Sequence, residues 1–219
     1  MNLKKIFSIS NILISLIVCS LVFIACISAK DYFMTPENKL YTALDFMRQN
    51  KPHKAERYFL MASKSDNTLI SKLSSYYLGN LYLKGGDGFK GNPQKAETYL
   101  EKSALLGSTR AAYELALLYD IGDQIPENRD KAIIYMIQAA EAGNADALYA
   151  MGVWAERGYM DDVPFGKIVK VYEMAAEKGH VNAMKSLIAI YKNGYGEFPY
   201  NIERANFWMH KLNETENKK

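Results

Sequence analysis

Cysteine is nearly absent from this sequence of 219 residues. The two cysteines, Cys19 and Cys26, both lie within the first 29 residues. Residues 30–219 therefore offer no internal disulfide and no thiol nucleophile. The stability of this part of the chain must come from packing.

Histidine and excess charge of one sign are also scarce. The three histidines lack metal-ligand spacing, and the formal net charge is only +3. A nucleic-acid-binding surface needs a basic patch, and no predicted helix carries one. No nucleophile or acid–base pair stands next to a third group that could hold it. We therefore predict a protein that is not an enzyme, with no catalytic residue, cofactor, metal or nucleic-acid partner.

The one long hydrophobic run lies at the N-terminus. Lys4 and Lys5 precede an uncharged, mostly aliphatic segment that ends at Ala29. A positive start, an apolar stretch and a small-residue exit are typical of an export signal. The run is also long enough to span a bilayer, for which about 20 apolar residues suffice.

Three alternatives for this segment follow, and the sequence leaves all three open. Residues 22–26, Val-Phe-Ile-Ala-Cys, resemble a bacterial lipobox, which would make Cys26 a lipidation site. The segment could instead stay uncleaved as a membrane anchor, with its positive start in the cytoplasm. Cleavage after Ala29 would give a soluble periplasmic protein. Each alternative predicts that residues 30–219 lie in the bacterial periplasm. In the first two the protein is attached to a membrane through the N-terminal segment only, and in the third it is soluble.

The rest of the chain is organised by an internal repeat. One pattern opens on a small residue, at Ser74, Ala111, Ala147 and Ala183. It closes on a glycine, at Gly85, Gly122, Gly158 and Gly194, in steps of 37, 36 and 36 residues. A fixed period of this length indicates a solenoid of supersecondary units.

Each unit contains two stretches with apolar residues at helical spacing. The first helices are predicted at 69–84, 109–121, 145–157 and 181–193, and the second helices at 93–105, 129–141, 165–177 and 201–212. The predicted division of the chain is a signal peptide or anchor at 1–29, a linker at 30–37, a degenerate N-terminal capping repeat at 38–68, four repeats at 69–107, 108–143, 144–179 and 180–212, and a disordered tail at 213–219.

The loops inside the repeats are rich in glycine but lack the ending of a phosphate-binding loop. What they share is one apolar residue each, namely Phe89, Ile125, Val163 and Phe198. We interpret this residue as a plug between the two helices of its own repeat.

These features resemble the Sel-1-like repeat, a relative of the tetratricopeptide repeat. The residues that carry the resemblance are Leu78-Gly79-Asn80-Leu81-Tyr82 with Gly85, and the closing signatures at 139–143 and 175–179. The departures are Ala116 and Ile188 in place of the first-helix glycine, Ala155 in place of its tyrosine, and Ile168 in place of the second-helix alanine. The resemblance implies an all-α, right-handed α-solenoid, which serves as an adaptor or scaffold.

In such a solenoid the first helices line a concave face, and extended concave surfaces are used for binding. This register predicts a partner-binding site on that face at Tyr76, Arg110, Tyr113, Asp120, Tyr149, Glu156, Arg157 and Lys185. Tyrosine and arginine are common anchors of interfaces. The alternative for the tyrosines is that they only pack between neighbouring helices.

The predicted function is a non-catalytic protein-binding module of the bacterial cell envelope. Its sharpest form is an immunity protein, an activity that the resemblance includes among exported members, which would neutralise a toxic effector such as a secreted lipase. The alternatives are a scaffold or assembly factor for an envelope complex, or a regulator of a cell-wall enzyme.

Overall fold

A computed structural model describes residues 31, 33–160, 163–195 and 198–217. This part of the chain holds ten α-helices and no β-strand. The helices are α2 (Pro36–Arg48), α3 (Pro52–Ala62), α4 (Thr68–Lys84), α5 (Pro93–Leu105), α6 (Thr109–Ile121), α7 (Arg129–Glu141), α8 (Ala145–Glu156), α9 (Phe165–Glu177), α10 (Val181–Asn193) and α11 (Ile202–Glu216). The predicted helices of the four repeats agree with these bounds to within one residue, except at the C-terminal end of α11.

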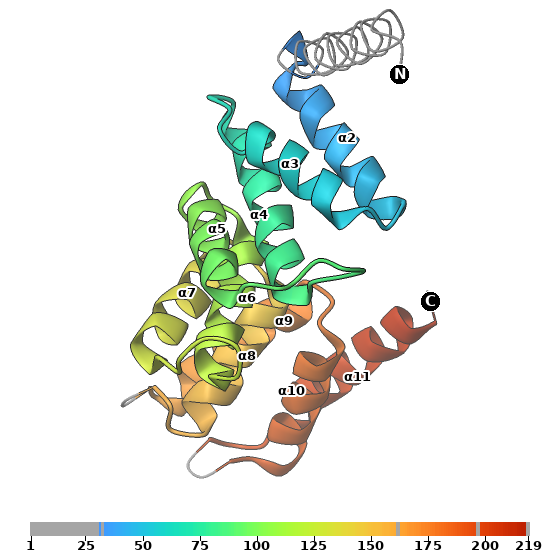
Figure 1. Cartoon of the computed structure of the whole chain (residues 1–219). Helices are drawn as coiled ribbons and strands as arrows, with labels where there is room; N and C mark the ends of the chain where they lie inside the picture. The colour runs from blue at the N-terminus through green and yellow to red at the C-terminus, as the bar shows by residue number, and fades with distance from the viewer. Residues whose placement is uncertain (1–30, 32, 161–162, 196–197, 218–219) are drawn as a thin grey trace, which may run out of the picture.

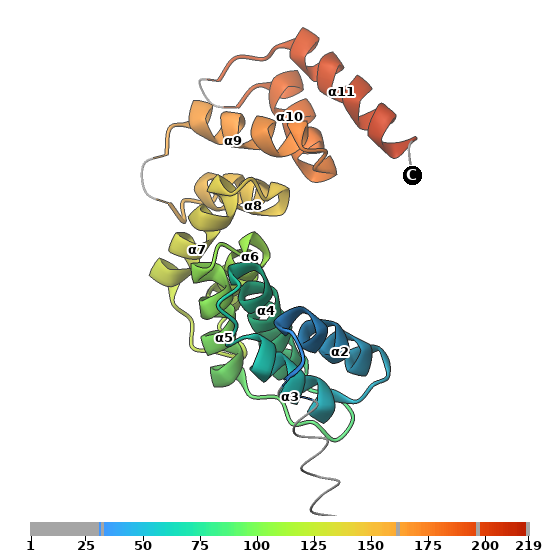
Figure 2. The same cartoon turned by 90° about the horizontal axis from the view of Figure 1, so that it is seen from above.

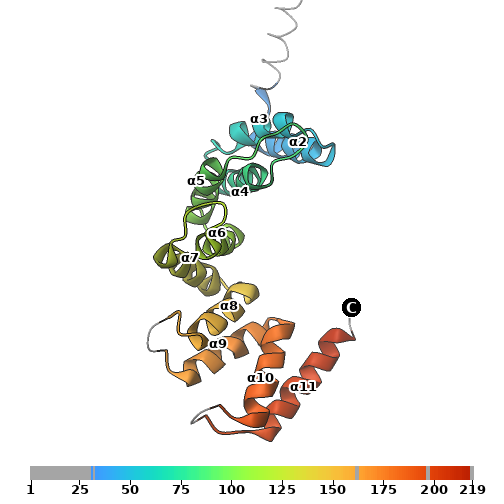
Figure 3. The same cartoon turned by 60° about the horizontal axis from the view of Figure 1, so that its bottom comes forward.

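Consecutive helices form antiparallel pairs that stack in chain order (Figure 1). A view from another side shows the same order along a curved stack (Figure 2). In Figure 3 the stack forms an arc, with α4 and α6 on its inner side and α5 and α7 on its outer side. The expected α-solenoid is thereby confirmed, and the first helix of each pair faces the hollow of the arc.

The turns between successive pairs follow from their sequence. Gly107, Gly143 and Gly179 have φ values of 80°, 82° and 87°, a left-handed conformation that other residues rarely adopt. The next residue caps the following helix, because the side chains of Ser108 and Asn144 accept hydrogen bonds from backbone N–H groups of the first turn. The repeated glycine and cap therefore set where each pair begins.

His180 is a better cap than its residue type suggests. Its Nδ1 accepts a hydrogen bond from the Ala183 N–H at 3.1 Å, as the side-chain oxygens of Ser108 and Asn144 do in earlier repeats. Its ring stacks on Tyr149 with centroids 4.5 Å apart. Packing against Tyr149 thus fixes the imidazole in the capping position.

Burial of the apolar loop residue is confirmed most clearly in the first two full repeats, although its ring contacts reach the preceding helix pair and not only its own repeat. Phe89 is only 7% exposed and Ile125 only 2%, whereas Val163 and Phe198 are half-buried. Phe89 contacts the Tyr82 ring of its own repeat and the His53 ring of the capping pair. The loops are thus held by apolar burial against the helices.

A recurring polar contact joins three of the four first helices to the preceding second helix. The Tyr82 hydroxyl donates to Glu56 at 2.5 Å, and the Tyr119 hydroxyl donates to Glu97 at 2.5 Å. In the last repeat the Tyr191 hydroxyl donates to Glu173 at 2.8 Å. The third repeat departs, since Ala155 replaces the tyrosine and the preceding helix carries Ile133 and Ile137 where the glutamates would stand.

Two expectations about the ends of the solenoid need correction. The predicted linker at 30–37 is partly structured, because the buried Asp31 accepts hydrogen bonds from Arg57 and from the Tyr58 hydroxyl, both at 2.6 Å. Helix α2 also starts at Pro36, where the Thr35 side chain caps it. The disordered tail predicted from residue 213 is wrong up to Glu216, whose carboxylate lies 3.5 Å from Lys185 Nζ.

The predicted export or anchor segment at 1–29, with Cys26, lies outside the described residues. Within the described ranges, no helix combines the length and the apolar character that crossing a membrane requires.

Candidate partner-binding groove

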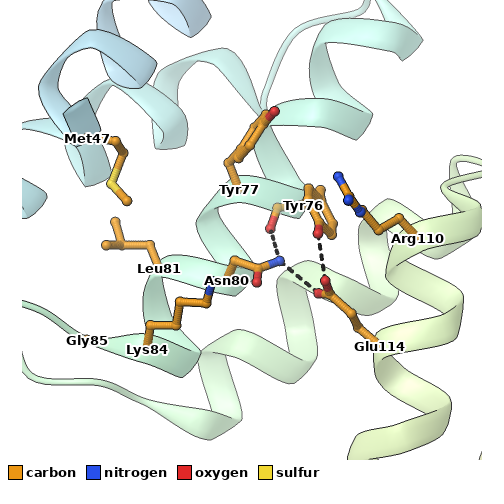
Figure 4. A pocket seen from close by; sticks show the side chains of 9 residues that line it. All are labelled: Met47, Tyr76, Tyr77, Asn80, Leu81, Lys84, Gly85, Arg110 and Glu114. Atoms are coloured by element: carbon orange, nitrogen blue, oxygen red, sulfur yellow. Dashed lines mark hydrogen bonds between the residues drawn. The ribbon is translucent and has the colours of Figure 1, made fainter. Parts of the chain in front are cut away.

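A groove lies on the inner side of the solenoid, between α2, α4 and α6. It has a volume of about 440 Å³. Its lining residues come from all three helices: Met47, Tyr76, Tyr77, Asn80, Leu81, Lys84, Gly85, Arg110 and Glu114 (Figure 4). We call it the α2–α4–α6 groove.

One wall of this groove is a fixed polar network. The Tyr76 hydroxyl donates to one carboxylate oxygen of Glu114 at 2.6 Å, and the Asn80 amide donates to the other at 2.8 Å. The Asn80 amide also donates to the Tyr76 carbonyl, one turn earlier on α4. Burial and the adjacent Glu114 carboxylate raise the pKa of Tyr76 well above its usual value, so its hydroxyl stays a donor.

Two cations in the groove have no acidic partner among the described residues. The Arg110 guanidinium lies over the Tyr76 ring, 5.8 Å from its centroid, and both Arg110 and Lys84 are exposed. Within the described ranges, no carboxylate lies within 4 Å of either cation. Glu114 is already engaged by Tyr76 and Asn80, so Lys84 and Arg110 are available to an external anion.

The rest of the groove is apolar. Met47 of α2 and Leu81 of α4 approach each other across one end, as Figure 4 shows, and Tyr77 lies between this end and Tyr76. Leu81 is buried, whereas the Met47 side chain is partly open to solvent. The groove thus offers an apolar surface beside a positive charge.

A smaller groove of about 230 Å³ occurs between α8 and α10. It is lined in part by Ala189, Ile190, Asn193 and Gly194, which occupy the same repeat positions as Asn80, Leu81, Lys84 and Gly85. Its acidic residue is Glu156, which accepts from the Tyr172 hydroxyl at 2.8 Å. Grooves between successive first helices are therefore a recurring property of the inner face, with different chemistry in each.

The predicted site residues fall into three groups. Tyr76 and Arg110 line the α2–α4–α6 groove, and Glu156 lines the smaller one. Tyr113 and Tyr149 are half-buried, and Tyr149 packs against the rings of Tyr172 and His180. For these two tyrosines the packing interpretation describes the observed contacts.

The remaining predicted residues do not converge with the first group. Arg157 is exposed and lines neither groove, and Lys185 is exposed and paired with Glu216. Asp120 is half-buried, and its burial raises the pKa of its carboxyl group above the usual value, although the nearby Arg129 acts in the opposite direction. The predicted residues thus form no continuous site.

Sequence reasoning missed several lining residues. The most informative are Lys84 and Glu114, because they supply the charge of the groove and its fixed carboxylate. Lys84 follows Leu83, which occupies the repeat position of the predicted residues Asp120 and Glu156, so the next position along the repeat would have found it. Met47 could not be found this way, because it comes from the irregular N-terminal pair. In the described part of the chain, no cluster of histidine, cysteine and acidic side chains could hold a metal ion.

The fold and these inner grooves define a helical repeat protein of the protein-binding class. The Sel1 repeat profile matches residues 41–67, 73–108, 109–144 and 188–214, which is more than half of the chain. The chain therefore belongs to the Sel1 repeat family, and Sel1 repeats are protein-binding modules. The profile also identifies residues 41–67 as a repeat, which the sequence alone indicated only as a degenerate one.

Solved structures support the same fold. The protective antigen c5321 of uropathogenic Escherichia coli, which has an SLR fold, matches with a TM-score of 0.70 and 22% identity over 82% of this chain and 38% of its own length. This chain thus spans well under half of that protein. A Sel1 repeat protein from Oxalobacter formigenes matches with a TM-score of 0.66 and 24% identity over 84% of this chain and 72% of that protein. No curated protein matches the sequence.

Proposed function

We propose that this Sel1 repeat protein binds a partner protein along the inner face of its solenoid, and that it does so without catalysis. The observation that carries the proposal is the α2–α4–α6 groove, where Lys84 and Arg110 lie beside apolar side chains and have no ion-pair partner in the described ranges. Recognition surfaces commonly combine buried apolar anchors with charges that select and orient the partner.

The sharper form of the proposal is neutralisation of a toxic effector in the bacterial periplasm. It is supported by the sequence pattern of residues 1–29, which is typical of export, and by the resemblance to a family with exported immunity proteins. A scaffold for an envelope complex, or a regulator of a cell-wall enzyme, is the alternative. The lipobox-like Cys26 further suggests attachment to a membrane, and loss of fatty-acid labelling in Cys26→Ser would support this.

The test uses site-specific photo-crosslinking in the cells that produce the protein. A photoreactive amino acid replaces Arg110 or Lys185 on the inner side, or Ile134 or Lys170 on the second helices α7 and α9. All four positions are exposed. We expect a discrete crosslinked partner from the inner positions and none from α7 or α9. Crosslinks from α7 and α9 alone would overturn the proposal.

The identity of the captured partner separates the alternatives. A toxic enzyme whose activity falls on addition of an equal amount of this protein would support the immunity function. Several structural envelope proteins, captured together, would favour the scaffold. An endogenous cell-wall enzyme with altered activity would favour the regulator.

A further inference from the structure

We infer that the α2–α4–α6 groove binds a partner segment in which an acidic side chain stands next to a large aliphatic side chain. This inference rests on the proposed function, since it names the chemistry that the inner face would recognise. It follows from three properties of the groove: its free cations, its occupied carboxylate and its apolar end.

The cations determine the sign of the partner's charge. Arg110 and Lys84 come from different helices, α6 and α4, and both are exposed and lack an acidic partner in the described residues. Arg110 is also positioned by the face of the Tyr76 ring. A cation over an aromatic ring keeps its N–H groups at the ring edge free to donate, so Arg110 can still bind a carboxylate.

Glu114 does not cancel these two charges. Both of its oxygens accept hydrogen bonds within the groove wall, from Tyr76 and from Asn80, at 2.6 and 2.8 Å. Those two donors stabilise the carboxylate in place and turn it away from Arg110, to which it forms no ion pair even though both stand on α6. The groove as a whole therefore carries a net positive charge, and its one acid is already satisfied.

The apolar end determines the neighbouring residue. At this end of the groove the side chain of Met47 is 40% exposed, next to the buried Leu81 and near Tyr77 (Figure 4). Methionine adapts to irregular partners, and a leucine-sized side chain of the partner would cover the exposed part of Met47. The groove is open rather than closed, so it accepts the middle of a segment. We therefore assign the acid to a side chain and not to a chain terminus.

The test measures binding of short peptides to the full-length protein in mild detergent by fluorescence anisotropy. The first probe is a rhodamine-labelled, end-capped peptide with the core Ser-Leu-Glu-Ser. Three matched peptides each carry one change: Gln in place of Glu, Lys in place of Glu, or Ala in place of Leu. A fifth peptide lacks acidic side chains but ends in a free carboxylate after Leu. We expect the Leu-Glu peptide to bind at least about 10-fold more tightly than each matched peptide, the scale of one charged hydrogen bond.

Variants of the protein then locate the binding site. Lys84→Ala and Arg110→Ala should each weaken binding of the Leu-Glu peptide by about 10-fold, whereas Lys170→Ala on α9 should leave it unchanged. Lys84→Glu combined with Arg110→Glu should reverse the preference, so that the peptide with Lys binds better than the peptide with Glu. Such a reversal cannot come from loss of folding.

Three results would overturn the inference. They are equal binding of the Glu and Gln peptides, preference for the free C-terminal carboxylate, and no binding of any peptide at millimolar concentration. None of these results contradicts the proposed function, because crosslinking from Lys185 tests partner binding at the inner face outside this groove. Conversely, failure of crosslinking from the inner face, with peptide binding intact, would remove the proposed function alone.

Discussion

Gly152 of α8 lies against the ring of Tyr172 on α9. A Cβ atom added at Gly152 would stand 2.4 Å from Tyr172 Cε1, closer than any normal contact. Tyr172 is itself buried and donates its hydroxyl to Glu156. The two helices of the third repeat therefore depend on a residue without a side chain at position 152.

Substitution at Gly152 should destabilise the protein. We expect Gly152→Leu to lower the free energy of unfolding by about 1–3 kcal/mol or more, since overpacking forces the Tyr172 ring to move. For a chain of this size that corresponds to several degrees in Tm. Gly166→Ala on α9 is the matched control, because nothing lies within 4 Å of an added Cβ there. Equal melting curves for wild type and Gly152→Leu would contradict the observed packing.

The Tyr119–Glu97 hydrogen bond should contribute measurably to the joint between the first two full repeats. Tyr119→Phe removes a donor shared with Glu101, and it also removes a contact of Lys131 Nζ with the Tyr119 hydroxyl at 2.8 Å. Losing such a bond from buried groups costs about 1–3 kcal/mol. Denaturant titration should show this loss. Tyr159→Phe, at an exposed ring, is the control and should change the denaturant midpoint little. Equal losses of stability in the two variants would argue against a contribution from the Tyr119 hydrogen bond.

The protonation of His180 should make the stability of the protein depend on pH. Burial lowers the pKa of His180 below its usual 6.5, although the carboxylate of Asp146 acts in the opposite direction. Protonation also removes the Nδ1 acceptor that caps α10. Because the folded pKa lies below the unfolded one, the stabilisation is present above pH 6.5 and is lost as the pH falls through the folded value. His180→Asn keeps a capping side chain without titrating, so its melting temperature should fall less than that of wild type between pH 7 and pH 5. Parallel curves would refute this role.

Phe89 should be needed for the stability of its loop and of the helices around it. Truncation of a buried phenylalanine to alanine costs about 3–5 kcal/mol, and Phe89 is packed between Tyr82 and His53. We expect Phe89→Ala to lower the Tm by at least several degrees and to increase proteolysis of the loop at 85–92. Tyr200→Ala, at a residue that is 73% exposed, is the control. If both variants melt alike, the loop residue is not a plug.

Much of this fold was predictable because local signals recur in phase. Capping residues such as Asn144 and left-handed glycines such as Gly143 act within a few residues, so the sequence locates the helix boundaries of each repeat. The end of α11 was missed although part of its support is local, since His210 and Lys211 both pair with Glu214. Glu216 also pairs with Lys185 of the neighbouring helix, and no pattern within residues 213–219 reveals that contact.

The candidate site was predictable only in part. The repeat register placed Tyr76 and Arg110 on the inner face, and both line the larger of the two inner grooves. The register does not tell how far a tyrosine such as Tyr149 sinks between its neighbours, because this depends on the stacking of His180. It also does not show that Glu114 is occupied by Tyr76 and Asn80. The charge available to a partner is therefore a property of the folded chain.

The most direct test of the account is the affinity of the crosslinked partner for variants of the inner and outer faces, measured by titration calorimetry. We expect Lys84→Glu combined with Arg110→Glu to weaken binding by at least about 10-fold, the loss typical of an interface anchor, while Lys170→Glu stays close to wild type. Unchanged affinity in the inner-face variant, together with weakened binding in Lys170→Glu, would contradict the central claim that the inner face of the solenoid binds the partner.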